Sequence, residues 1–329
     1  MMRIALLGFG SVGQGIVRSI LAKDLDITVT GLADSRSGII DAGGVDLAAA
    51  LARKEQGEPC GDPGISPTDV VERAEYDILI EVTPTNVETA EPALGYIRGA
   101  LRRGRHVVTS NKGPIALAYP ELRTLAEENG VFLKYEATVC GAIPLIHAIQ
   151  EGIAGNAITR ICGVFNGTCN YILTRMAAEG LTYEQALAEA RDLGYAEADP
   201  TYDVEGIDAG IKLVILANTV FDMDTTLDDV ERTGITLLSP EALQLAEDQD
   251  CTIRLIGEII PRVGVLRVSP RIVAKTHPLV VEGTLNAVTV ETDLAGDLTF
   301  IGKGAGSTET ASAVIGDLLY IQSRHVQGS

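Results

Sequence analysis

The sequence feature that most constrains the fold is a glycine motif near the N-terminus. An apolar run at residues 2–7 ends at Gly8-Phe9-Gly10-Ser11-Val12-Gly13, and apolar residues at helical spacing follow. A strand, the pattern G-x-G-x-x-G and a helix are together typical of a dinucleotide-binding βαβ unit. The first glycine makes the tight turn, the second lets the backbone approach a pyrophosphate, and the third lets helix and strand pack closely. The motif predicts a Rossmann-type parallel sheet, with residues 8–13 binding the cofactor.

The next predicted strand, residues 27–33, ends in a candidate ribose-binding residue. Asp34 follows the glycines by about twenty residues, where a carboxylate that binds ribose hydroxyls is expected. Arg36 comes two residues later and is suited to a 2′-phosphate instead. Asp34 favours NAD and Arg36 favours NADP, so the sequence leaves both cofactors open.

The α/β pattern continues with predicted buried strands at residues 76–82 and 105–109, and a shorter strand at 131–135. Ligands of open α/β sheets bind at the carboxyl ends of the strands. Thr83 and Lys112 directly follow two of these strands, so we expect both at the nicotinamide end of the cofactor. We expect the helix after Lys112 to begin only at about residue 121.

The composition changes at residue 136, where a second domain is expected to begin. Four strand-like runs follow, at residues 158–165, 252–260, 264–273 and 286–292. They predict an α+β domain with an open sheet, which binds substrate and forms a dimer interface. A second glycine loop, which contains Gly306, precedes an apolar helix. We therefore expect a nucleotide domain at 1–135, completed by 303–329, and a second domain at 136–302.

An acidic stretch, residues 194–212, is the strongest candidate for a site in the second domain. It carries five carboxylates and one amine, and an apolar helix is predicted from about residue 207. Asp208 and Lys212 are four residues apart, so they share one helical face. The stretch is compatible with an ordinary salt bridge at a helix start. A second interpretation, which the rest of the chain has to decide, is a polar pocket for a cationic substrate group, in which Lys212 carries a proton.

Charge and cysteine content exclude several classes of protein. The 329 residues carry a formal net charge of −19, which argues against a nucleic-acid partner and against anionic membrane surfaces. The five cysteines are odd in number and show no metal-ligand spacing, so we expect neither a disulfide framework nor structural zinc. The N-terminal apolar run is too short for a signal peptide and no run is long enough to span a bilayer. A cytoplasmic protein is expected.

Several ordered sequence blocks, spread over essentially the full length of the chain, carry a resemblance to a known enzyme family. The family's signature runs from Ala190 through Asp199-Pro200 to Asp208 and Lys212. Further matching blocks are SNKGP at 110–114, YEATVCGAIP at 135–144, NGTCNYIL at 166–173 and GKGAG at 302–306. These blocks resemble homoserine dehydrogenase, and the chain is similar to the short form of that family, which lacks an aspartate kinase and a C-terminal amino-acid-sensing domain, so threonine feedback through such a domain is not expected.

The resemblance implies NAD(P)-dependent interconversion of L-aspartate 4-semialdehyde and L-homoserine, in threonine and methionine biosynthesis. It implies that Lys212 is the proton donor, and that Lys112 lies between nicotinamide and substrate. Glu197 and Asp208 are implied to bind the amino and hydroxyl ends of the substrate, with support from Asp203. Thr168, at a predicted helix start, is a further candidate to contact the substrate.

A monovalent cation such as sodium is also implied, held by Glu136 and by the carbonyls of Val139, Gly141 and Ile143. Cys140 lies in this loop, where relatives often carry a smaller residue, and its redox sensitivity is left open. Two other hypotheses stay open. In the first, Cys140 with His147 as base makes the protein an acylating semialdehyde dehydrogenase. In the second, the protein is a non-catalytic sensor that binds a dinucleotide without turnover.

Overall fold

The structure is a computed structural model that describes residues 2–23 and 25–325. The chain divides into two compact units, residues 1–141 with 306–329 and residues 142–305. The sequence analysis placed the nucleotide domain at 1–135 with 303–329, so the division in the structure falls a few residues later at both points. Residues 1, 24 and 326–329 of that predicted domain lie outside the described residues. No helix in the described part of the chain is long and apolar enough to cross a membrane.

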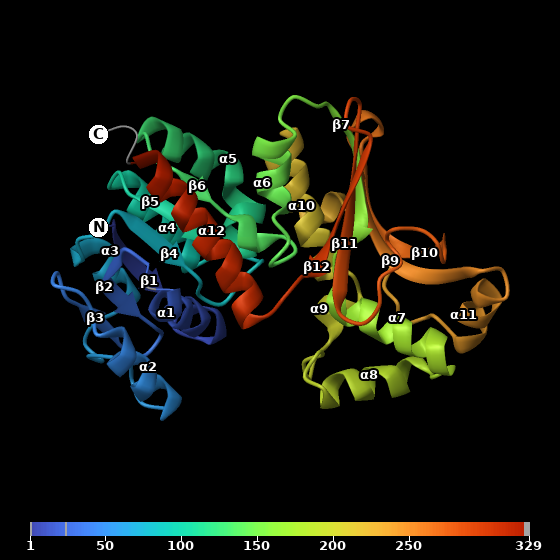
Figure 1. The fold of residues 1–329 in the computed structure, drawn as a ribbon, viewed down its shortest axis with the longest axis horizontal. Helices are drawn as coiled ribbons and strands as arrows, with labels where there is room; N and C mark the ends of the chain where they lie inside the picture. The colour runs from blue at the N-terminus through green and yellow to red at the C-terminus, as the bar shows by residue number, and fades with distance from the viewer. Residues whose placement is uncertain (1, 24, 326–329) are drawn as a thin grey trace. The chain divides into compact units, whose positions relative to one another are not determined.

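The first unit contains a six-stranded sheet in the order β3-β2-β1-β4-β5-β6 (Figure 1). The strands are β1 Met2–Leu7, β2 Ile27–Ala33, β3 Gly38–Ile40, β4 Ile78–Glu81, β5 His106–Thr109 and β6 Leu133–Lys134. All neighbours pair in parallel except β2 and β3, which are antiparallel. The predicted Rossmann-type sheet is therefore confirmed, and β3 is an addition that the sequence analysis did not predict.

Helices cover both faces of this sheet: α1 Ser11–Lys23, α2 Leu47–Glu55, α3 Pro67–Arg73, α4 Ala93–Arg102, α5 Lys112–Glu128 and α12 Ser307–His325. Side chains alternate between the faces along each strand. Ile78 and Ile80 of β4 belong to the core shared with α1, α2 and α12. The C-terminal helix α12 packs against α1, although the two helices lie at opposite ends of the chain (Figure 1).

Helix α5 begins at Lys112, so the expected start at about residue 121 was wrong. The side chain of Asn111 caps the helix by accepting a hydrogen bond from the backbone of Gly113. Pro114 lies in the first turn, where the missing proline N–H removes no helical hydrogen bond. The backbone is non-helical at Ala118, just before Pro120, so only the second half of α5 shows a regular apolar spacing.

The second unit contains another six-stranded sheet, in the order β12-β11-β7-β9-β10-β8. Its strands are β7 Ile158–Val164, β8 Glu231–Arg232, β9 Cys251–Ile260, β10 Val265–Ala274, β11 Leu285–Thr292 and β12 Asp297–Lys303. Its helices are α6 Leu145–His147, α7 Gly167–Glu179, α8 Tyr183–Asp192, α9 Thr201–Val204, α10 Ile207–Phe221 and α11 Pro240–Glu247. Only β8 pairs in parallel, with β10. The predicted open sheet is confirmed, whereas β8 and β12 were not predicted.

The two faces of this second sheet differ in what covers them. A Cβ atom added to Gly257 would lie within 3.1 Å of Phe165 and Leu213, so this face packs against α10. The opposite face carries a small apolar cluster, in which Cys162 and Ile256 contact Leu279 and Val281 of the segment before β11. Helix α10 is almost completely buried, which places Asp208 and Lys212 inside the unit.

Candidate active site

The glycine motif forms the turn between β1 and α1. Gly8 has a positive φ of 99°, and a Cβ there would lie 2.4 Å from the carbonyl oxygen of Val82. A Cβ on Gly13 would lie 2.0 Å from the carbonyl oxygen of Gly8, whereas Gly10 has nothing within 4 Å. The first and third glycines therefore permit close packing, and the second leaves space in front of the helix start, where a pyrophosphate is stabilised.

The other residues of the motif and the second glycine loop lie at the same helix start. Phe9 is buried, Val12 is half-buried and Ser11 is exposed at the first turn of α1. Gly306 has a φ of 131° and immediately precedes α12. The hydroxyl of the next residue, Ser307, donates to the carbonyl oxygen of Ser11 at 2.5 Å. The structure thus brings Gly306 beside the glycine motif.

The carboxylate of Asp34 is buried and saturated with donors. Its Oδ1 accepts hydrogen bonds from the backbone of Arg36 at 2.8 Å and of Ser37 at 2.9 Å. Its Oδ2 pairs with the ammonium of Lys54, from α2. Burial opposes ionisation, but the bonds from Lys54, Arg36 and Ser37 hold the pKa of Asp34 below its usual value. Lys54 was missed by the sequence analysis because the pairing joins residues that only the fold brings together.

Thr83 and Lys112 lie at the carboxyl edge of the same sheet, as predicted. Thr83 follows β4, and its amide and hydroxyl donate to Glu81. Lys112 is half-buried at the N-terminus of α5. The amide of Asn111 donates to the carbonyl oxygen of Thr83 at 3.2 Å, which joins the two segments.

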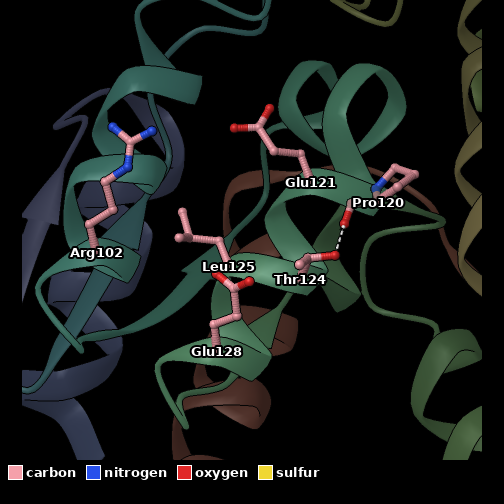
Figure 2. Close-up of a pocket in the computed structure, with 6 residues that line it drawn as sticks. All are labelled: Arg102, Pro120, Glu121, Thr124, Leu125 and Glu128. Carbon is pink, nitrogen blue, oxygen red and sulfur yellow. Dashed lines mark hydrogen bonds between the residues drawn. The ribbon is translucent and has the colours of Figure 1, made fainter.

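A surface pocket of the first unit lies away from this edge. Figure 2 shows its lining between the end of α4 and the second half of α5: Arg102, Pro120, Glu121, Thr124, Leu125 and Glu128. Its volume is about 400 Å³. Helix α4 runs from the carboxyl to the amino ends of the strands, so Arg102, its last residue, marks the opposite edge of the sheet. The pocket contains none of the predicted site residues.

In the second unit, Lys212 lies within a compact polar cluster. Its ammonium donates to Asp208 Oδ2 at 2.7 Å and to the carbonyl oxygen of Phe165 at 2.6 Å. Lys212 is 7% exposed and Asp208 5% exposed. The predicted pair on one helical face is therefore present, but its burial distinguishes it from the solvated salt bridges that are common on helices.

Asn166, which the sequence analysis did not select, connects this pair to a second acid. Its amide nitrogen donates to Asp203 Oδ1 at 2.7 Å and to Asp208 Oδ2 at 3.0 Å. Its amide oxygen caps α7 by accepting from the backbone of Cys169. Burial and the nearby charge of Asp208 raise the pKa of Asp203, against the hydrogen bond from Asn166 and the charge of Lys212. An asparagine before a predicted helix indicates a helix cap. Its hydrogen bonds to two carboxylates could not be predicted from its position in the sequence.

The remaining predicted substrate residues lie at the start of α7 and on the loop after α8. The hydroxyl of Thr168 donates to the carbonyl oxygen of Tyr195 at 2.7 Å, so α7 is joined to the loop after α8. Glu197 is exposed on that loop, and Arg191 donates to its backbone carbonyl. Between described residues, no hydrogen bond joins the Glu197 carboxylate to the cluster of Lys212, Asp208, Asp203 and Asn166.

The predicted cation residues are split between the two units. Glu136 and Val139 are buried in the first unit, and Cys140 and Gly141 both have a positive φ. Ile143 belongs to the second unit. Among the described residues, no cluster of three acid, histidine or cysteine side chains forms a metal site. Cys140 is 1% exposed, which does not suit a nucleophile that must reach a substrate.

Together, a glycine loop at a helix start and a buried ammonium–carboxylate cluster define a dinucleotide-dependent oxidoreductase. Comparison with known proteins gives the family. The homoserine dehydrogenase model matches residues 144–319, and the model of the homoserine dehydrogenase NAD binding domain matches residues 8–136. The chain belongs to the homoserine dehydrogenase family, as the resemblance implied, and it has that family's NAD(P)-dependent activity.

Three relatives match this chain over nearly their whole length. Homoserine dehydrogenase of Methanocaldococcus jannaschii is 44% identical over 97% of this chain and 98% of its own. The crystal structure of a putative homoserine dehydrogenase from Archaeoglobus fulgidus has a TM-score of 0.91 and 47% identity, covering 98% and 99% of the two chains. A hyperthermophilic archaeal homoserine dehydrogenase in complex with NADPH has a TM-score of 0.84 and 31% identity, covering 98% of each chain. These relatives favour neither an acylating dehydrogenase nor a sensor.

Proposed function

We propose that Lys212 is the proton donor when L-aspartate 4-semialdehyde is reduced to L-homoserine, in threonine and methionine biosynthesis. The nicotinamide cofactor supplies the hydride to the aldehyde carbon, or accepts it in the reverse direction. Negative charge then develops on the aldehyde oxygen, and a positioned ammonium stabilises it and transfers a proton to give the hydroxyl. The observation that carries this proposal is the buried Lys212 ammonium, only 2.7 Å from Asp208.

We propose further that the acids around Lys212 bind the substrate's amino group. Asp208 and Asp203 are held by one amide of Asn166, so two carboxylates converge where a cation would be attracted. Thr168 and Glu197 are proposed to contact the substrate from the start of α7 and from the loop after α8. Lys112 is proposed to lie between nicotinamide and substrate.

The test is oxidation of NADPH or NADH with L-aspartate 4-semialdehyde. We expect turnover with at least one cofactor, and the product should be identified as L-homoserine by mass spectrometry. Tight binding of NADPH without turnover would contradict the proposal and leave a dinucleotide-binding protein of another function.

For the cofactor, we propose NADPH in preference to NADH. The carboxylate of Asp34 is already engaged by Arg36, Ser37 and Lys54, and it therefore has little capacity left for ribose hydroxyls. Lys54 pairs with this single acid, and the exposed Arg36 follows it by two residues in the chain, a charge balance that suits a 2′-phosphate.

The Lys54→Ala variant tests this preference. We expect its KM for NADPH to rise about tenfold, the size of one charge-assisted hydrogen bond, with a much smaller change for NADH. Steady-state kinetics with both cofactors measures the ratio. Arg53→Ala, which removes an exposed cation from the same helix, is the matched control. An equal rise for both cofactors in Lys54→Ala would mean that Lys54 does not read the 2′-phosphate.

We propose that the protein is a homodimer joined through the second unit. The sheet face opposite α10 carries a hollow of about 320 Å³, lined by Arg160, Cys162 and Ile256 among others. Ile301, whose strand neighbour Ala287 belongs to the apolar cluster on this face, is 54% exposed. Sedimentation velocity of the wild type should give twice the mass of the chain. In the Ile301→Lys variant, the measured mass should shift toward that of the monomer. A monomeric wild type would refute the dimer.

For the cation, we propose that Glu136 and the carbonyls of Val139, Gly141 and Ile143 hold a monovalent ion such as sodium. Glu136 is 2% exposed and its backbone N–H donates to the buried Asp317, so negative charge gathers where oxygen ligands are available. Activity and melting temperature should be higher in sodium chloride than in choline chloride of equal ionic strength. Identical values in both salts would count against the site.

A further inference from the structure

One carboxyl group of the first unit is completely buried and has not been assigned a function. Glu81 is the last residue of β4, and it is 0% exposed. Ile78 and Ile80 face the core against α1, so Glu81 points to the opposite face of the sheet, the side of α4. The rest of β4 is apolar, which makes a carboxylate at this position costly unless its oxygens are satisfied.

Within residues 2–23 and 25–325, the hydrogen bonds to the Glu81 carboxyl group come from donors at the carboxyl edge of the sheet. Its Oε1 accepts from the backbone of Thr83 at 2.8 Å and from the Thr83 hydroxyl. Its Oε2 accepts from the hydroxyl of Thr109, its neighbour in the β5 register, at 3.0 Å. An ionised carboxylate accepts at all these positions, whereas a protonated acid or an amide is accommodated only if a threonine hydroxyl turns from donor to acceptor.

The network extends from Glu81 to the start of α5. The Thr109 hydroxyl accepts from the backbone of Asn111 at 2.9 Å. Asn111 in turn donates to the carbonyl oxygen of Thr83 and caps α5, whose first residue is Lys112. The two segments that follow β4 and β5 are therefore held to each other through one buried carboxyl group.

The glycine motif abuts the same segment. A Cβ on Gly8 would lie 2.8 Å from the backbone nitrogen of Thr83. Burial raises the pKa of Glu81, while the hydrogen bonds from Thr83, Thr109 and Asn111 favour the ionised form. A displacement of the Glu81 carboxylate would thus act first on Thr83 and, through Thr109, on the start of α5, because its hydrogen bonds go to these two threonines.

We propose that Glu81 is a positioning residue for hydride transfer, which holds Thr83 and the start of α5 at Lys112 in the arrangement that receives the nicotinamide ring. This inference rests on the proposed function, which places the nicotinamide at this edge. It assigns Glu81 to the nicotinamide end alone, because the proposed place of the adenosine end is at Lys54 and Arg36, after β2, and that of the pyrophosphate is at the glycine motif.

The experiment compares two ligands that differ only in the nicotinamide, NADH and ADP-ribose, by calorimetry on the Glu81→Gln variant. The glutamine amide has nearly the shape of the carboxylate, but its NH₂ group presents a hydrogen-bond donor to Thr83 or Thr109. We expect the affinity for NADH to fall about tenfold or more and that for ADP-ribose to change less than about twofold. Glu75→Gln is the matched control, because this side chain is 73% exposed and lies before β4, at the opposite end of the strand.

Two results would overturn the proposal. Unchanged affinity for NADH would show that Glu81 positions nothing, and an equal loss for both ligands would show a general structural role. If Glu81→Gln does not fold, Thr109→Val removes one donor to Oε2, and Thr109→Ser restores it; the same selective loss for NADH, with rescue in the serine variant, is expected. Wild-type turnover of aspartate semialdehyde is assayed in parallel, since its absence would refute the proposed reaction without altering the comparison of the two ligands.

Discussion

Replacing Lys212 with alanine should lower kcat by about a hundredfold or more, the usual range for a general acid, while the affinity for NADPH stays close to that of the wild type. The ammonium belongs to the second unit and the dinucleotide motif to the first, so cofactor binding does not require Lys212. Stopped-flow and steady-state oxidation of NADPH with aspartate semialdehyde measure the effect.

The control for this variant is Lys275→Ala, which removes a cation from the same unit that pairs with Glu247 on the surface. It should keep wild-type turnover. Because Lys212→Ala leaves the buried Asp208 without its ammonium, the melting temperature of the variant has to be measured as well. A folded Lys212→Ala protein with wild-type kcat would exclude Lys212 as the proton donor.

The second large effect is expected at the glycine motif. In Gly13→Ala, the new methyl group would lie 2.0 Å from the carbonyl oxygen of Gly8, so the turn between β1 and α1 has to move. Overpacking of this kind costs about 1–3 kcal/mol, and here the displaced atoms are the ones that approach the pyrophosphate. We expect the affinity for both NADPH and NADH to fall by at least about tenfold, as measured by fluorescence titration.

Gly316→Ala is the matched control, since this glycine of α12 has nothing within 4 Å of the position of its Cβ. That variant should bind cofactor normally and gain up to about 1 kcal/mol of stability from the better helix propensity of alanine. Normal cofactor affinity in Gly13→Ala would mean that the turn tolerates the added methyl group.

The parts of the site that the sequence predicted are those with local causes. The glycine motif is contiguous, and the Asp208–Lys212 pair follows from the spacing of one helical turn. The start of α5 was misplaced because SNKGP contains a glycine and a proline, which signal a loop, whereas the cap at Asn111 makes the same residues a helix start. β12, at the edge of its sheet, mixes charged residues and glycine with apolar ones and gave no strand signal.

The parts that could not be predicted join residues far apart in the chain. Lys54 reaches Asp34 only because α2 returns to the end of β2, and Asn166 reaches Asp208 only because α7 and α10 pack in one unit. For Glu81, the apolar neighbours predicted a buried strand, but one of the donors to its carboxyl group, Thr109, comes from the adjacent strand β5. Such pairings depend on sheet register, which local spacing does not encode.

The packing of α12 on α1 has a consequence for the order in which the chain can fold during synthesis. Four side chains of α12 complete the core of the first unit: Ala311, Val314, Leu318 and Ile321. The second unit is one continuous segment, residues 142–305, and all of it leaves the ribosome before α12 does. Domains generally fold as units while the chain emerges. The first unit therefore keeps an open apolar face until the last helix is made, and the second unit can fold before the first is complete.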